Sequence, residues 1–135
     1  MTPKKERLFR PEYAQELLRI AAGDLDSAKV LLVAKKGRLE NIGYHAAQCI
    51  EKSLKAMLVL LKKPVPLTHD LGSITERVSQ YVPFDIQADL TMFTEYVTTR
   101  RYEESEMILE TDDLEAAIAI ASQVLEWVIK NNPQK

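Results

Sequence analysis

Apolar side chains recur at steps of three and four residues along most of the chain, which is the spacing of one face of an α-helix. The first stripe begins after Pro11 and ends at Lys35-Lys36-Gly37, since positive charge and a glycine are typical of a helix C-terminus. Four such stripes predict four long helices. The first two stripes are Ala14, Leu18, Ala21, Leu25, Ala28 and Leu32, and then Ile42, Ala46, Cys49, Ile50, Met57 and Leu60. The last two are Ile86, Leu90, Phe93 and Val97, and then Leu114, Ala117, Ile118, Ala121, Leu125 and Val128.

Prolines separate the later stripes. Pro64 and Pro66 stop the second helix, because proline cannot continue the hydrogen-bond ladder and restricts the residue before it. A shorter helix is expected after Thr68, and Pro83 ends it. The sequence therefore predicts an all-α protein, an antiparallel up-and-down bundle of four long helices plus a short helix. Residues 11–132 are expected to form a single domain, preceded by a basic N-terminal tail at residues 1–10.

The composition is that of an ordinary soluble domain. The 135 residues are 46% hydrophobic and 28% charged, which excludes disordered and collagen-like chains. Lys and Arg number 18 against 20 Asp and Glu, so the chain is not basic throughout, as a nucleic-acid-coating protein would be. No apolar run approaches the roughly 18 residues of a membrane span, and the basic start lacks the apolar stretch of a secretory signal.

Cysteine and histidine are scarce. The single cysteine, Cys49, excludes an internal disulfide and a cysteine-rich zinc module, and it fits a reducing, cytoplasmic setting. Cys49 lies on the inner face of the second helix, which favours an inert buried thiol over a nucleophile. The two histidines, His45 and His69, would need carboxylates to complete a metal site. We expect neither a metal nor a cofactor.

Charge is unevenly distributed. Residues 29–63 contain eight Lys and Arg against two Glu, and residues 103–115 contain seven acids and no base. A basic hairpin attracts a phosphate-bearing ligand, whereas the acidic segment suits a basic surface of the same protein or of a second subunit. The alternative is that both segments are solvated faces that keep the protein in solution.

Within the basic hairpin, His45, Gln48, Lys52 and Lys55 lie three, four and three residues apart and therefore share one helical face. Such a row can hydrogen-bond a nucleotide or an RNA phosphate, with lysine as a compact charge. The alternative is an exposed row balanced by Glu51 and by acids of a neighbouring helix.

Two further polar groups lie at helix ends. Thr68 or Asp70 can cap the short helix, and His69 can donate to a carboxylate or tie the loop to the bundle. Arg101 follows Arg100 at the end of the fourth helix. These arginines satisfy free carbonyl groups or clamp a phosphate, and Tyr102 can stack on a base.

Three segments together resemble the HEPN family of small helical domains. The first is Ala22-Gly-Asp-Leu-Asp-Ser-Ala28 and the second is Tyr44-His-Ala-Ala-Gln-Cys-Ile-Glu-Lys-Ser-Leu-Lys-Ala56. The third is Thr68-His-Asp-Leu71, followed thirty residues later by Arg101-Tyr102. The resemblance spans residues 17–128 and implies a helical bundle that usually forms a homodimer.

Many stand-alone members of this family are similar to toxin–antitoxin partners and are encoded beside a minimal nucleotidyltransferase. Other branches are metal-independent RNases in which an Arg-x4-6-His motif acts on the RNA backbone. Arg38 and His45 have the loosest form of this spacing, although they straddle the linker into the second helix. Arg38, His45 and His69 are therefore the candidate catalytic residues.

The leading interpretation is a homodimeric nucleotide- or RNA-binding regulatory partner of a minimal nucleotidyltransferase, with no membrane association. The alternatives are a metal-independent endoribonuclease and a purely structural dimer. The candidate ligand-binding residues are Lys52, Lys55, His69, Asp70, Arg101 and Tyr102.

Overall fold

The computed structural model describes residues 5–86, 88, 90–93 and 110–134. Its elements are β1 (Glu6–Arg7), α1 (Tyr13–Ala34), α2 (Leu39–Leu60), β2 (Val65–Pro66), α3 (Leu71–Ser79), the 3-10 helix η1 (Leu90–Phe93) and α6 (Thr111–Lys130). The all-α fold class is confirmed. The described part of the expected fourth helix contains only η1, and the rest of it, with Val97, lies outside the described residues.

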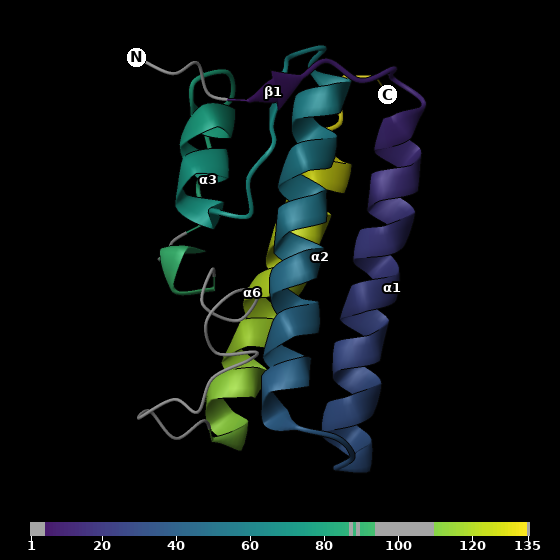
Figure 1. Ribbon diagram of the computed structural model, residues 1–135, viewed down its shortest axis with the longest axis vertical. Helices are drawn as coiled ribbons and strands as arrows, with labels where there is room; N and C mark the ends of the chain where they lie inside the picture. The colour runs from purple at the N-terminus through teal and green to yellow at the C-terminus, as the bar shows by residue number, and fades with distance from the viewer. Residues whose placement is uncertain (1–4, 87, 89, 94–109, 135) are drawn as a thin grey trace.

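The long helices α1 and α2 are antiparallel neighbours, and α6 lies behind α2 and runs in the same direction as α2 (Figure 1). The short α3 stands beside the upper half of α2 (Figure 1). Because α2 packs against α1, α3 and α6, most of its 22 residues are buried. A polar side chain on α2 is therefore held against the core unless it lies on the narrow face that the neighbours leave open.

Small residues on α1 set how closely α1 and α2 approach. Ala14, Ala21 and Ala28, seven residues apart, are fully buried, and so are Ala46 and Ala47 of α2.

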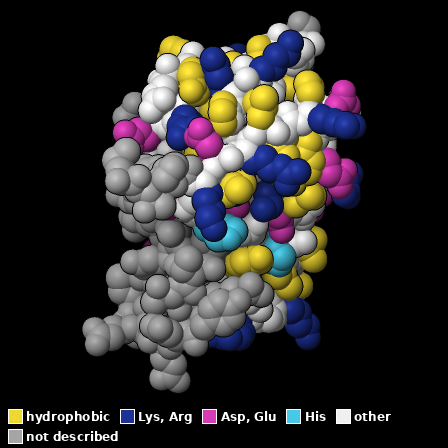
Figure 2. Space-filling model, turned by 45° about the horizontal axis from the view of Figure 1, so that its top comes forward, with side chains coloured by type: hydrophobic (Ala, Val, Ile, Leu, Met, Phe, Trp, Pro, Cys, Tyr) yellow, Lys and Arg dark blue, Asp and Glu magenta, His cyan; other side chains and the backbone are white. Residues whose placement is uncertain are grey.

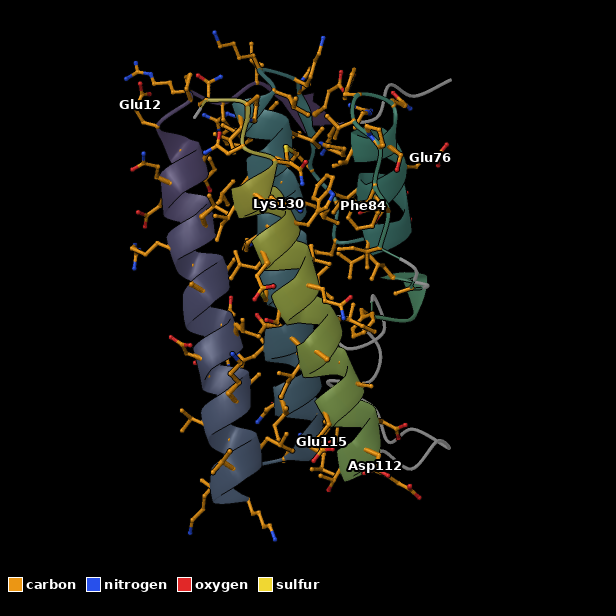
Figure 3. All side chains as sticks on the ribbon, turned by 180° about the vertical axis from the view of Figure 1, so that it is seen from behind. Glu12, Glu76, Phe84, Asp112, Glu115 and Lys130 are labelled. Atoms are coloured by element: carbon orange, nitrogen blue, oxygen red, sulfur yellow. The ribbon has the colours of Figure 1, made fainter. Side chains whose placement is uncertain are left out.

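Aromatic packing supports the other side of the bundle. Phe84 lies beside the C-terminal half of α6, where its ring meets Trp127 edge to face at 4.8 Å between centroids (Figure 3). Trp127 is thus part of the core.

The N-terminal segment adds a small antiparallel sheet to the bundle. Glu6 pairs with Pro66 and Arg7 pairs with Val65, and the Leu67 amide donates to the Lys5 carbonyl at 3.0 Å. Arg77 of α3 also holds the N-terminal segment, because it donates to the Glu6 carboxylate at 2.8 Å. The residues expected as a basic tail therefore fix the loop between α2 and α3.

Both long helices of the basic hairpin end in a left-handed residue that is not glycine. Lys35 has φ 55° after α1, and Lys62 has φ 60° after α2. The following amides close the turn, since Lys36 donates to the Leu31 carbonyl and Lys63 donates to the Leu58 carbonyl. This is the Schellman arrangement, in which glycine is the preferred left-handed residue.

Lys35→Gly is expected to stabilise the protein by about 1 kcal/mol, because glycine removes the steric cost of the left-handed conformation. The midpoint of thermal unfolding should rise by about 3–5 °C for a chain of this length. Lys36→Gly is the matched control, since Lys36 is not among the residues with positive φ. A Lys36→Gly variant as stable as Lys35→Gly would contradict the explanation.

Among the described residues, no helix has both the length and the apolar character needed to cross a membrane.

Candidate functional site

A buried carboxylate lies at the centre of the polar face of α2. The side chain of Glu51 is 0% exposed, and three groups contact its two oxygens. His69 Nδ1 lies 2.9 Å from Oε1, while Lys55 Nζ lies 3.0 Å and Lys52 Nζ lies 3.4 Å from Oε2. We call Glu51, Lys52, Lys55 and His69 the Glu51 cluster.

The local sequence explains how the Glu51 cluster forms. Lys55 is one turn beyond Glu51 on α2, a spacing that brings a glutamate and a lysine together. His69 comes from the loop between β2 and α3, which is anchored on both sides. On one side β2 pairs with β1. On the other side Asp70 caps α3 by accepting the Gly72 amide at 3.2 Å.

The hydrogen bonds of Asp70 hold the loop and the start of α3. Its carboxylate also accepts the Ser73 hydroxyl at 2.6 Å, and its own amide donates to Thr68 Oγ1 at 3.1 Å. The structure therefore places Asp70 in a capping network beside the Glu51 cluster. The carboxylate that His69 contacts is that of Glu51.

Glu51 is held in its ionised form. Burial alone raises the pKa of a carboxyl group, but here the charge of Lys55 and the hydrogen bonds from His69 and Lys55 act in the opposite direction. Together with the charge of Lys52 they outweigh burial, so the pKa of Glu51 lies below its ordinary value. An ionised carboxylate only accepts hydrogen bonds, and His69 Nδ1 therefore carries a proton.

The hydrogen-bond donors of the Glu51 cluster are accessible to solvent to different degrees. The His69 side chain is 63% exposed, and those of Lys52 and Lys55 are 24% and 13% exposed. Each ammonium group has three N–H donors, of which Glu51 occupies one. With one buried negative charge and two lysines, the cluster has a net positive charge. These properties suit an anion that approaches from solvent.

A second histidine on α2 has a similar partner. His45 Nδ1 lies 2.9 Å from Asp24 Oδ1 of α1, and both side chains are partly buried. Figure 2 shows the two histidine side chains on one face of the molecule, with Lys and Arg side chains beside and above them. Arg38, in contrast, pairs with Glu40 at 3.5 Å at the start of α2. The two residues with the Arg-x4-6-His spacing therefore have different partners, Asp24 for His45 and Glu40 for Arg38.

Three predicted residues at the end of the expected fourth helix cannot be placed in the site. Arg101 and Tyr102 lie outside the described residues, as does Arg100. Glu51 appears in the sequence only as a counter-charge to the lysine row, and its burial is the feature that sequence reasoning missed. One signal was present, because Glu51 lies between Ile50 and Leu54 on a helix that is apolar on several sides.

Cys49 is chemically inert in this fold. Burial raises the pKa of its thiol to about 12, and Sγ lies 3.7 Å from the Ala121 carbonyl oxygen. The prediction of an unreactive buried thiol is confirmed, since thiol nucleophiles act as thiolates. Across the described part of the chain, no group of three or more His, Cys, Asp and Glu side chains is arranged to hold a metal ion.

The chain is similar to known proteins in sequence and in fold. Residues 14–132 match the model of the HEPN domain family. A protein of Methanocaldococcus jannaschii named "Putative toxin MJ1304" is 42% identical over 52 residues, which are 38% of this chain and 33% of that protein. The match thus spans about a third of this relative. The crystal structure of ST0689, an archaeal HEPN homologue, has a TM-score of 0.67 at 20% identity and shares the fold over 91% of this chain and 98% of that chain.

Proposed function

Because this chain belongs to the HEPN domain family, we propose that it is a homodimeric nucleotide- or RNA-binding protein that regulates a minimal nucleotidyltransferase. The two proteins would form a toxin–antitoxin-like pair, and the name of the Methanocaldococcus jannaschii relative supports this class. The observation that carries the binding role is the buried Glu51 carboxylate, which gathers Lys52, Lys55 and His69 at the surface.

A phosphate group is the ligand that the Glu51 cluster suits best. The two lysines offer charge-assisted hydrogen bonds to phosphate oxygens, which are about twice as strong as neutral ones. Phosphate at His69 favours the imidazolium form, in which Nε2 donates to the ligand while Nδ1 donates to Glu51. Binding is therefore expected to take up a proton at Nε2. Arg101 and Tyr102 are proposed to add a phosphate clamp and a stacking surface.

Nucleotide binding is tested by titrating the purified protein with AMP in a calorimeter at low salt. Lys52→Gln is expected to weaken AMP binding at least tenfold, because one charge-assisted contact is worth about 1.5–3 kcal/mol. His69→Gln should weaken it comparably. Both side chains reach solvent, so these variants should remain folded. Lys36→Gln is the matched control from the exposed end of the basic hairpin. Unchanged AMP binding in Lys52→Gln and His69→Gln would refute the binding site.

A second candidate function is a metal-independent endoribonuclease, and the two histidine–carboxylate pairs favour it. Each carboxylate fixes a proton on Nδ1, which leaves Nε2 of the neutral ring as a proton acceptor. One histidine would take the proton of a ribose 2′-hydroxyl, whose oxygen attacks the phosphorus. The P–O5′ bond breaks, and the other histidine, as an imidazolium, protonates the departing oxygen.

Cleavage of cellular RNA in EDTA distinguishes the two functions. The endoribonuclease predicts cleavage by the wild-type protein that is lost in the His45→Ala/His69→Ala double variant. The regulatory binding protein predicts no cleavage by either protein. It also predicts co-purification with a nucleotidyltransferase and a dimer twice the 15.4 kDa mass of the chain.

A further inference from the structure

The N-terminal segment forms a stack of a cation and two aromatic rings at the end of the bundle that bears β1. The Arg7 guanidinium lies over the Phe9 ring at 5.0 Å from its centroid. The Phe9 and Tyr13 rings stack at 4.8 Å between centroids, with 23° between their planes. Tyr13 begins α1 and is 38% exposed. The stack therefore ends in an aromatic ring that remains accessible to a ligand.

A second cation–aromatic pair lies at the same end. Lys63 Nζ lies 4.9 Å from the centroid of the Tyr81 ring, and Tyr81 is 40% exposed. The pairing of Arg7 with Val65 places the segments that carry Phe9 and Lys63 side by side. Phe9 follows Arg7 by two residues and Lys63 precedes Val65 by two, so both leave the same end of the antiparallel sheet.

Positive charge surrounds these rings. Arg7, Lys62 and Lys63 lie in the two segments that carry the stack and the pair, and the neighbouring Lys5 and Arg10 are also basic. The N-terminal segment also contains two acids, of which Glu6 is paired with Arg77 and Glu12 directly precedes Tyr13. Figure 2, which brings this end forward, shows Lys and Arg side chains interspersed with hydrophobic side chains there. We call Arg7, Phe9, Tyr13, Lys62, Lys63 and Tyr81 the basic aromatic surface.

We propose that the basic aromatic surface binds single-stranded RNA by stacking bases on Tyr13 and Tyr81 while the lysines and Arg7 meet the phosphates. Single strands are the nucleic acids that expose base faces, and aromatic rings among basic side chains are the groups that bind them without sequence readout. A duplex hides its bases and offers only its phosphates to this surface. The binding is separate from the Glu51 cluster and does not rest on the function proposed for it.

The test is the fluorescence anisotropy of a labelled twelve-nucleotide oligouridine with the full chain at 50 mM salt. Tyr13→Leu/Tyr81→Leu keeps apolar volume but removes both rings, and it is expected to weaken binding at least tenfold. Tyr13→Phe/Tyr81→Phe keeps the rings and should bind as the wild type does. Thermal unfolding of each variant shows that the fold is retained. If a double variant fails to fold, the single variants Tyr13→Leu and Tyr81→Leu are expected to give several-fold losses each.

Salt dependence tests the phosphate contacts independently of stacking. For single strands the slope of log K against log salt is about −0.7 for each neutralised phosphate. Lys62→Gln/Lys63→Gln is therefore expected to reduce the slope by about 1.4. AMP binding at the Glu51 cluster should be unchanged in this variant, so a failure of one site is distinguishable from a failure of the other.

Three results would overturn the proposal. The first is oligouridine binding that is equal in the wild-type protein and in Tyr13→Leu/Tyr81→Leu. The second is equal affinity for a duplex RNA of the same length, which would show that phosphates alone are bound. The third is retention by vesicles of phosphatidylcholine with phosphatidylserine in the absence of any oligouridine binding, which would make the surface a membrane contact.

Discussion

Glu51→Ala is expected to lower the free energy of unfolding by about 3 kcal/mol, the largest effect of any charged residue in the described chain. The substitution removes the acceptor of three donors and leaves a void beside Ile50 and Leu54, which are fully buried. Lys55 is left mostly buried without its counter-charge. The magnitude lies at the lower end for a broken buried pair, because His69 and Lys52 can turn towards solvent.

Chemical unfolding in urea measures this loss. Glu126→Ala is the control, since Glu126 is exposed on α6 and a surface substitution should change stability by no more than about 0.5 kcal/mol. If Glu51→Ala unfolds at the same urea concentration as Glu126→Ala, Glu51 is not the organising residue of the site.

Acid is expected to remove the same stabilisation in the wild-type protein. The folded-state pKa of Glu51 lies below its ordinary value, so folding favours the ionised carboxylate. This contribution is complete above the unfolded-state pKa of about 4.3, and it is lost as the pH falls through the lower folded-state pKa. Between pH 6 and pH 3, the stability advantage of the wild type over Glu51→Gln should shrink by on the order of 1 kcal/mol.

The comparison with Glu51→Gln isolates this carboxyl group from the other acids that titrate in the same range. Urea midpoints are measured for both proteins at each pH, and only their difference is interpreted. A difference that is constant from pH 6 to pH 3, or that grows in acid, would contradict a lowered pKa for Glu51.

The sequence predicts the helices well because their signal is repeated many times. Each long stripe offers several apolar residues at helical spacing, and the burial of Ala14, Ala21 and Ala28 follows directly from it. Helix ends depend on single residues and are harder to predict. The capping box of α6 uses Glu110 and Asp113, whereas the spacing of Asp112 and Glu115 fits the same motif equally well. In the structure Asp112 and Glu115, labelled at the start of α6 in Figure 3, are both exposed.

Contacts between distant segments are the features that the sequence does not show. The strands β1 and β2 have two residues each, too few for an alternating pattern to appear. Their pairing joins the N-terminal segment to the loop between α2 and α3, and nothing in the local sequence indicates it. The spacing of Glu51 and Lys55 predicts their contact, but the burial of Glu51 and its bond to His69 depend on how α3 packs against α2.

The most direct measurement is a long-range proton–nitrogen NMR correlation of the two histidine rings, recorded with and without AMP in the wild type and in Glu51→Gln. In the neutral His69 ring of the wild type, Nδ1 is expected to carry the proton, and AMP should shift Nε2 towards the value of a protonated nitrogen. In Glu51→Gln the amide NH₂ faces His69, so the proton should move to Nε2 before AMP is added. A wild-type His69 with its proton on Nε2, or one whose nitrogens do not respond to AMP, would contradict a phosphate site organised by Glu51.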